Sequence, residues 1–146
     1  MNTESTIVIR APKRRIFDVA SDLSRWPELL PHYRFIEYLE RGDDRHIVRM
    51  ACYRDKLPIS WVSEQIIDRE RLEIRFLHLR AFTKGMAVVW SFEEKPEGTL
   101  VRIVHVLRFR IPPLAPIAEP IIGGFFIEDI ASKTLRAFKA HFESGK

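Results

Sequence analysis

The chain has 146 residues, of which 46% are hydrophobic and 30% are charged, and its formal net charge is +4 at pH 7. This composition excludes a disordered chain, and the single cysteine excludes an intrachain disulfide or a cysteine-based zinc site. The basic residues are scattered among acidic ones, which favours a solvated surface over nucleic-acid binding, and the length predicts one domain over residues 1–146.

No export or membrane segment is predicted. The N-terminal stretch MNTESTIVIR lacks the basic region and long apolar run of a signal peptide. The longest apolar stretch, Ile111 to Ile127, is interrupted by prolines and Glu119, and it is shorter than the roughly 20 residues that cross a bilayer. Together with the single cysteine, these features lead us to expect a soluble, cytoplasmic protein.

The N-terminal part predicts a short strand followed by two helices. Thr6 to Arg10 is rich in β-formers, and Pro12 suits the first turn of a helix over residues 11–23. The apolar residues of that segment repeat with helical spacing: Ile16, Val19, Ala20 and Leu23. A second short helix is expected over residues 24–30, with Ser24 as its N-cap.

The remainder predicts six strands and a long helix. From Tyr33 to Arg110 the sequence alternates as in strands, and it is broken by turn-forming stretches at 41–44, 54–56, 68–71, 82–85 and 96–99. Helical spacing returns in the stripe of Ile127, Ile130, Ala131, Thr134, Leu135, Phe138 and Phe142. We therefore expect an α+β fold in which a seven-stranded curved antiparallel sheet wraps around a long C-terminal helix.

The tight hairpins predict the register of the sheet. We take the two-residue loops to be Glu97-Gly98, Arg69-Glu70 and Asp55-Lys56. These loops place the following residues opposite each other: Trp90 and His105, Trp61 and His78, Met50 and Trp61. All three loops agree on which alternate residues face inward.

The predicted inner face is mixed in polarity. It carries Met50, Trp61, Ser63, Gln65, Phe76, His78, Trp90 and His105. Each polar group buried there without a partner costs about 1–3 kcal/mol, so a dry core would disfavour this set. A concave wall of aromatic residues with a few polar groups is typical of ligand pockets. We therefore predict a ligand cavity between the sheet and the last helix.

Four stretches resemble the START-related helix-grip superfamily: APKRRIFDVASDLSRWPELLPHY, SWVSEQ, GMAVVWSF and the terminal amphipathic helix. The nearest branch is that of the polyketide cyclase/aromatase proteins, with the coenzyme Q-binding proteins as near relatives. The resemblance extends from about Thr6 to Phe142, and its most specific part is Ala11 to Leu29. It implies a helix-grip fold and a pocket that folds a linear poly-β-ketone.

The resemblance also implies two catalytic positions. The tyrosine that follows the second helix matches Tyr33, and the arginine that the branch carries on the WVS strand is replaced by Gln65. Glutamine cannot stabilise an enolate by charge, so the arginine-based mechanism does not transfer directly. Arg54 and Arg80, at strand ends with the inward parity, are candidates to replace that arginine.

The remaining site candidates come from the inner face. His78 and His105 are candidate acid/base groups, since burial would keep an imidazole neutral, although each could instead only pack. Trp61, Trp90, Phe76 and Phe126 could stack on a planar ligand or belong to the core. The histidines show no ligand spacing for a metal, so neither a metal nor another cofactor is expected.

Two functions remain open from the sequence. The first is a cyclase/dehydratase that acts on an aromatic or polyketide-like molecule through Tyr33, His78 or His105, with Met50, Ser63, Gln65 and the aromatic residues named above as ligand contacts. An acyl carrier protein could then deliver the substrate. The second is a non-catalytic carrier of a quinone or lipid. Residues 112–124 could form a mobile pocket mouth or a rigid approach to the helix, and the chain could be a monomer or a homodimer.

Overall fold

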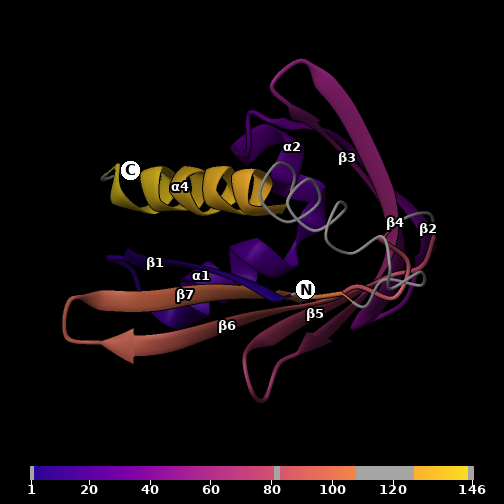
Figure 1. Ribbon diagram of the computed structural model, residues 1–146. Coiled ribbons are helices and arrows are strands. Elements are labelled where there is room, and N and C mark those ends of the chain that lie inside the picture. Colours follow the sequence, from indigo (N-terminus) through magenta and orange to yellow (C-terminus); the bar gives the residue numbers. More distant parts are fainter. Residues whose placement is uncertain (1, 81–82, 108–126, 145–146) are drawn as a thin grey trace.

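A strongly curved antiparallel sheet holds the long C-terminal helix in its concave side (Figure 1). The computed structural model describes residues 2–80, 83–107 and 127–144. The described elements, in chain order, are β1 Asn2–Ile9, α1 Lys13–Ser21, the 3-10 helix η1 Leu23–Arg25, α2 Trp26–Leu29, β2 Tyr33–Arg41, β3 Arg45–Arg54, β4 Leu57–Asp68, β5 Glu73–His78, β6 Ala87–Lys95, β7 Gly98–Val106 and α4 Asp129–Glu143.

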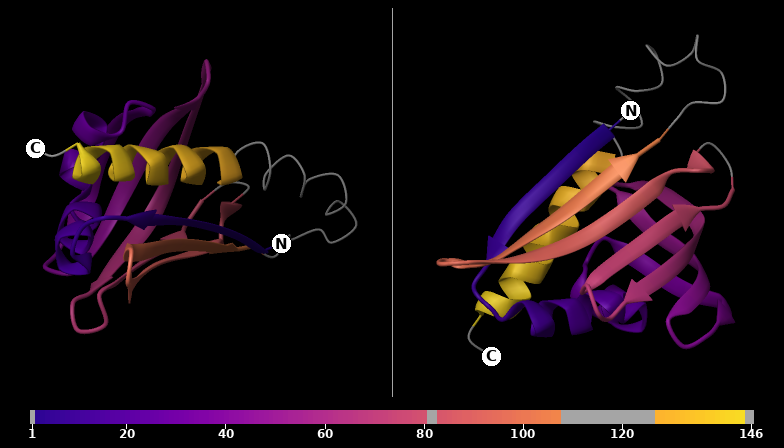
Figure 2. Two further views of the ribbon diagram at one scale, coloured as in Figure 1. Left: turned by 90° about the vertical axis from the view of Figure 1, so that its left-hand side faces the viewer. Right: turned by 90° about the horizontal axis from the view of Figure 1, so that it is seen from below.

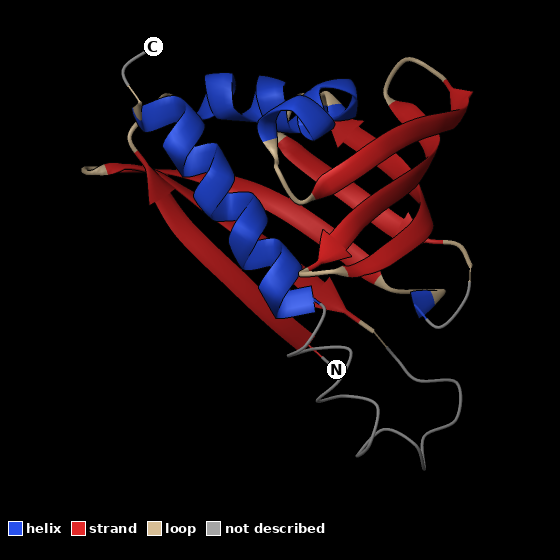
Figure 3. Ribbon diagram, turned by 90° about the horizontal axis from the view of Figure 1, so that it is seen from above, coloured by secondary structure: helices blue, strands red, loops and turns tan. Residues whose placement is uncertain are grey.

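The seven strands follow the order β1-β7-β6-β5-β4-β3-β2. Strands β2 to β7 form a meander, and β1 pairs with β7 at one edge of it. Figure 2 shows how the sheet bends around α4, and Figure 3 shows α1 and α2 covering the concave side beside that helix. This is the predicted α+β architecture, and the seven strands and three α-helices of the described residues lie close to the predicted positions.

Alternating strand directions gather several inward-facing residues at one end of the sheet. Because neighbours are antiparallel, the starts of β2, β4 and β6 lie beside the ends of β3, β5 and β7. Tyr33, Trp61, His78 and His105 all lie near these strand ends, which we call the histidine end. The opposite ends of the strands, near Gln65, lie against α1.

One of the three predicted hairpin registers is confirmed and two are wrong by two residues. Asp55-Lys56 is the β3–β4 loop, and Met50 pairs with Trp61 as expected. The other two hairpins keep the predicted parity, and therefore the predicted inner face, but they pair different residues.

The physical reasons differ between these two hairpins. In the β6–β7 hairpin, Lys95 pairs with Gly98, so the loop is Pro96-Glu97 and Gly98 belongs to β7. A Cβ on Gly98, whose φ is +146°, would lie 2.5 Å from the carbonyl oxygen of Ile9, so this glycine permits close approach to β1. Trp90 consequently pairs with Ile103, and Val88 pairs with His105.

In the β4–β5 hairpin the loop uses four residues, 69–72. The carboxylate of Asp68 accepts hydrogen bonds from the backbone N–H groups of Glu70 and Arg71, and Leu72 adopts a positive φ of 53°. This wider turn shifts the pairing, so Ser63, rather than Trp61, lies opposite His78.

Three helix and strand boundaries also differ from the prediction. The first strand begins at Asn2, because it pairs with β7 over its whole length. The N-cap of the short helical segment is Asp22 instead of Ser24, because the Asp22 carboxylate accepts the backbone N–H of Ser24 at 3.2 Å. Pro12 is the N-cap residue of α1 instead of a member of its first turn.

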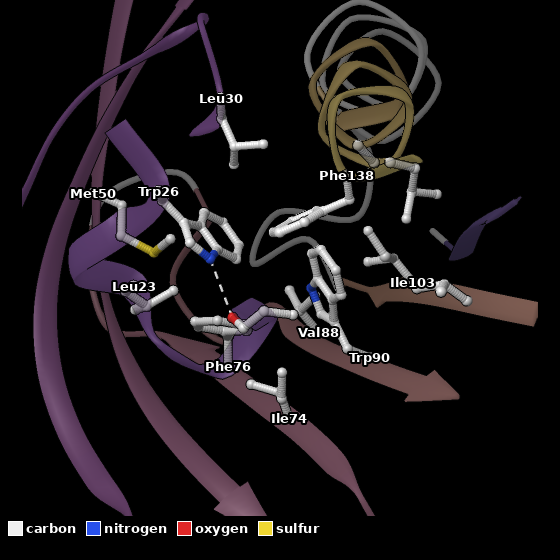
Figure 4. Packing of buried hydrophobic residues seen from close by; sticks show 14 of the residues in the cluster. Leu23, Trp26, Leu30, Met50, Ile74, Phe76, Val88, Trp90, Ile103 and Phe138 are labelled. Carbon is white, nitrogen blue, oxygen red and sulfur yellow. Dashed lines mark hydrogen bonds between the residues drawn. The ribbon is translucent and has the colours of Figure 1, made fainter. Parts of the chain in front are cut away.

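The core is organised around Trp26 (Figure 4). Its ring lies 5.2 Å from that of Tyr33, 5.6 Å from Trp90 and 5.8 Å from Phe138, measured between centroids. The indole N–H donates to the carbonyl oxygen of Ala20 at 3.1 Å. Trp26 thus joins α2, the sheet and α4 in one contact.

We expect the Trp26→Ala variant to lose about 3–5 kcal/mol in the free energy of unfolding, since it opens a cavity where three elements meet. Trp61→Ala should lose clearly less, because the Trp61 side chain is only partly buried. Urea unfolding followed by circular dichroism measures both. Equal losses for the two variants would contradict the central position assigned to Trp26.

Candidate functional site

The site is built from aromatic rings at the histidine end. Trp61 stacks on His78 with a centroid separation of 5.8 Å and an interplanar angle of 8°. Tyr33 meets Trp61 edge to face at 6.2 Å, and it also contacts Trp26. Residues on β2, β4 and β5 thereby form one continuous aromatic wall on the concave face.

Two histidines extend this wall across the sheet. His78 Nδ1 lies 2.9 Å from Thr83 Oγ1, and this contact fixes the orientation of the imidazole. His105, on β7, is close enough to His78 for its charge to lower the pKa of His78. The Nδ1 atom of His105 is buried and has no hydrogen-bond partner among the described residues.

Burial keeps these imidazoles neutral. Desolvation lowers the pKa of His78 to about 3, with a further contribution from His105, and it lowers the pKa of His105 to about 4. The pKa of Tyr33 is raised well above 10, chiefly by desolvation and then by Cys52. At neutral pH the site therefore holds two neutral imidazoles and a protonated phenol.

A third histidine connects the site to the C-terminal helix, and the sequence analysis did not select it. His32 Nε2 lies 2.9 Å from Thr134 Oγ1, and this hydroxyl donates to the carbonyl oxygen of Ile130 at 2.8 Å. The His32 ring contacts Tyr33 at 5.0 Å. Its position directly before Tyr33 was the available sequence clue. Burial and Lys133 lower the pKa of His32 to about 4.

The inward-facing side chains differ in accessibility along the sheet. At the histidine end Thr3, Ile59, Trp61 and His105 remain partly exposed, although their cross-strand partners place them on the concave face. Toward α1, the inward-facing residues Gln65, Ile67, Ile74 and Ile103 are buried. Access to the concave face is therefore concentrated at the end that carries the histidines.

Gln65 and Ser63 lie deeper than the sequence suggested. Gln65 is fully buried, and its Nε2 donates to the carbonyl oxygen of Ser21 at 3.0 Å, which ties β4 to the end of α1. The Oε1 of Gln65 and the Oγ of Ser63 are buried, and within the described ranges they have no hydrogen-bond partner. The amide nitrogen of Gln65 thus has a structural role, whereas its amide oxygen is available to accept a hydrogen bond.

The two candidate replacement arginines lie elsewhere. Arg54 forms ion pairs with Asp55 and, at 3.4 Å, with Asp129 at the start of α4. Arg80 is exposed in the stretch that follows β5. The guanidinium of Arg54 is therefore already engaged by carboxylates, and Arg80 faces solvent.

The other predicted ligand contacts divide into two groups. Met50, Phe76 and Trp90 are buried on the concave face, where Phe76 and Trp90 pack on Trp26. Phe126 and the segment 112–124 lie outside the described residues. The two tryptophans predicted to line the pocket therefore differ in their surroundings. Trp61 stacks on His78, whereas Trp90 belongs to the packed core.

Within the described ranges, no group of three or more His, Cys, Asp or Glu side chains is placed to hold a metal ion. In the same part of the chain, no helix is both long and apolar enough to cross a membrane.

A curved seven-stranded antiparallel sheet around a C-terminal helix, with polar groups on its concave face, defines the class of START-like helix-grip proteins. A family model described as polyketide cyclase/dehydrase and lipid transport matches residues 1–143. The chain therefore belongs to this polyketide cyclase/dehydrase and lipid transport family.

Individual relatives agree with this assignment. A candidate polyketide cyclase from Streptomyces cyaneus is 36% identical over 121 residues, which cover 81% of this chain and 78% of that protein. A solved aromatase/cyclase from a Streptomyces species has a TM-score of 0.74 at 18% identity and covers 99% of this chain and 98% of its own. A START superfamily protein from Mycobacterium smegmatis has a TM-score of 0.76 at 14% identity, with 99% of both chains covered.

We expect the free energy of unfolding to decrease as the pH is lowered, and we expect His78 and His105 to cause part of this decrease. Their folded-state pKa values of about 3 and about 4 lie below the ordinary value of 6.5, so below pH 6.5 the unfolded chain binds protons that the folded chain does not. The free energy of unfolding should then decrease as the pH falls from 6.5 toward 4, by up to about 1.4 kcal/mol per pH unit for each histidine.

Urea unfolding at pH 7, 6 and 5 measures this slope. The His78→Gln/His105→Gln double variant should show a shallower slope than the unsubstituted protein, because glutamine does not titrate. An unchanged slope would mean that the two imidazoles are not desolvated in the folded state.

We expect Gln65→Leu to lower the free energy of unfolding by about 1–3 kcal/mol, because the carbonyl oxygen of Ser21 would lose its donor in a buried setting. Glu64→Gln, on the neighbouring residue, removes only an exposed ion pair with Arg45 and should cost less than about 1 kcal/mol. Chemical denaturation compares the two. Equal, small effects would show that the Gln65 amide does not hold β4 to α1.

Proposed function

We propose that this protein is an aromatase-like cyclase/dehydratase that folds a polyketide-like chain on its concave face and moves protons through His78, His105 and Tyr33. Family membership supports the reaction class. The observation that carries the proposal is the stack of Trp61 on His78, with Tyr33 at the edge of the indole. We also propose that residues 1–146 act as one ligand-binding domain.

The geometry supports a sequence of proton transfers. A methylene between two ketones loses a proton to an imidazole, and the resulting enolate carbon attacks a second carbonyl carbon to form the ring bond. The new alkoxide takes back a proton from the imidazolium, and loss of water then introduces the double bond. A neutral imidazole and a phenol that stays protonated can donate hydrogen bonds to the enolate and alkoxide oxygens.

The flat rings at the site suit a planar product. Trp61 offers an indole face that is partly exposed, and aromatic side chains bind planar rings through offset stacking. The same wall would hold an extended chain in a bent conformation, which brings the reacting carbons together. We therefore propose a hydrophobic polyketide as the ligand and an acyl carrier protein as the partner that delivers it.

The single thiol is consistent with an intracellular setting. Cys52 is buried, and desolvation raises its pKa to about 12, so it is unreactive in the folded protein. We propose that the protein acts in the cytoplasm, where a free cysteine stays reduced.

A second function deserves a direct test because of Gln65. Glutamine stands where the resemblance implies an arginine, and the Gln65 amide nitrogen is used to hold α1. A site without that cation could carry a quinone or lipid without transforming it. Native mass spectrometry of freshly purified protein separates the two functions, since a retained isoprenoid quinone would favour the carrier.

We expect the His78→Gln/His105→Gln variant to lose at least tenfold in the yield of correctly cyclised product, because both proton-transfer groups are removed. The assay is reconstitution with a ketosynthase and an acyl carrier protein, followed by chromatography and mass spectrometry. His141→Gln, on the last turn of α4, is the matched control and should retain activity. Full turnover by the double variant would remove the proposed role of the two histidines.

A further inference from the structure

A threonine on the first strand lies opposite one of the site histidines. Thr3 pairs with His105 in the β1–β7 ladder, so both side chains point to the concave face. The Oγ1 of Thr3 and the Nδ1 of His105 are both buried, and neither has a hydrogen-bond partner in the part of the chain that the structure describes. These two atoms come from directly opposed residues, whose Cβ atoms in such pairs lie about 4.5–5.5 Å apart.

Unpaired polar atoms of this kind are costly in an ordinary core. A buried hydroxyl or imidazole nitrogen without a partner destabilises a protein, and most buried polar side-chain atoms in folded proteins have a partner. Valine would fill the position of Thr3 with nearly the same shape and without that cost. The presence of two unpaired polar atoms on directly opposed residues points to a partner that arrives with a ligand.

The hydrogen-bonding capacity of the pair indicates what that partner is. A threonine hydroxyl can donate one hydrogen and accept another, and a neutral imidazole nitrogen can accept or donate. One hydroxyl group on a ligand can accept from Thr3 and donate to His105, which satisfies both atoms at once. A carbonyl oxygen can only accept.

We propose that Thr3 and His105 form a subsite for a neutral hydroxyl group, phenolic or enolic, at one end of the ligand. This inference rests on the proposed function and deepens it. A carboxylate is disfavoured there because a buried anion requires a paired cation. The nearest ionisable group with a described electrostatic effect is His78, which is neutral at pH 7.

The first strand extends to the histidine end of the sheet and brings Thr3 there. Asn2 pairs with Val106, and β1 then runs along β7 as far as Ile9, which pairs with Thr99. The alternate residues Thr3, Ser5 and Ile7 are partly exposed, whereas Ile9 is buried. The accessible part of the inner face therefore includes the start of β1, and a ligand seated on Trp61 and His78 would have Thr3 at its far side.

The test uses three probes of one size and shape: 2-naphthol, 2-naphthoate and naphthalene. Dissociation constants are measured by equilibrium dialysis with the unsubstituted protein, Thr3→Val and Thr3→Ser. We expect 2-naphthol to bind more tightly than the other two probes. Thr3→Val should weaken 2-naphthol roughly three- to tenfold, which is the worth of one neutral hydrogen bond, and should leave naphthalene unchanged.

Two variants guard against a purely structural effect. Thr3→Ser keeps the hydroxyl and should restore most of the affinity for 2-naphthol. Thr6→Val lies on the same strand but is exposed and pairs with Arg102, so it should change no affinity. The Thr3→Val protein should melt no lower than the unsubstituted one, because removal of an unpaired buried hydroxyl is not destabilising.

The outcomes separate this inference from the proposed function. If naphthalene and 2-naphthol bind equally well to the unsubstituted protein and to Thr3→Val, the hydroxyl subsite is wrong and the aromatic ligand site stands. A preference for 2-naphthoate would also overturn the subsite. Failure of all three probes to bind would overturn the subsite together with the ligand site on which it rests.

Discussion

The packing of Trp26 between the sheet and α4 is the constraint on which the rest of the structure depends. Its ring contacts Tyr33, Trp90 and Phe138, and its N–H is satisfied by the carbonyl oxygen of Ala20. An indole in this position fills the middle of the concave face with close-packed carbon. The rings at the histidine end therefore lie on one side of Trp26, where Tyr33 contacts both Trp26 and Trp61.

Several buried polar atoms on the concave face lower the stability that this packing provides. Ser63, Gln65 and His105 each bury an atom without a partner, and all three lie on strands that the core holds firmly. Proteins keep such costs where a ligand or a reaction needs them, and compensate with packing elsewhere. The concave face therefore combines close packing around Trp26 with buried polar atoms both at the histidine end and near α1, where Gln65 lies.

The sequence predicted the elements and the inward parity well because both depend on local pattern. Alternation along strands and helical spacing do not depend on the exact turn residues. The two-residue error in the predicted β6–β7 pairing therefore left the predicted inner face unchanged. The details that failed depend on contacts between distant segments. The N-terminal residues of β1 are polar, Asn2 and Glu4 are weak β-formers, and pairing with β7 makes Thr3 part of the sheet. Likewise nothing local shows that Gln65 reaches Ser21 across 44 residues.

Desolvation also decides what chemistry the histidines suit. An imidazole whose pKa is about 3 or about 4 is a weak base at neutral pH, and a catalyst near neutral pH gains from a base whose pKa is closer to the working pH. The neutral ring nevertheless donates and accepts hydrogen bonds without the cost of a buried charge, as a preorganised oxygen-binding group should. Developing negative charge on a bound enolate would favour the protonated ring and raise its pKa during the reaction. In the proposed reaction, the same burial that makes these groups weak bases would make their response to the charge of an enolate strong, since electrostatic interactions are less screened there.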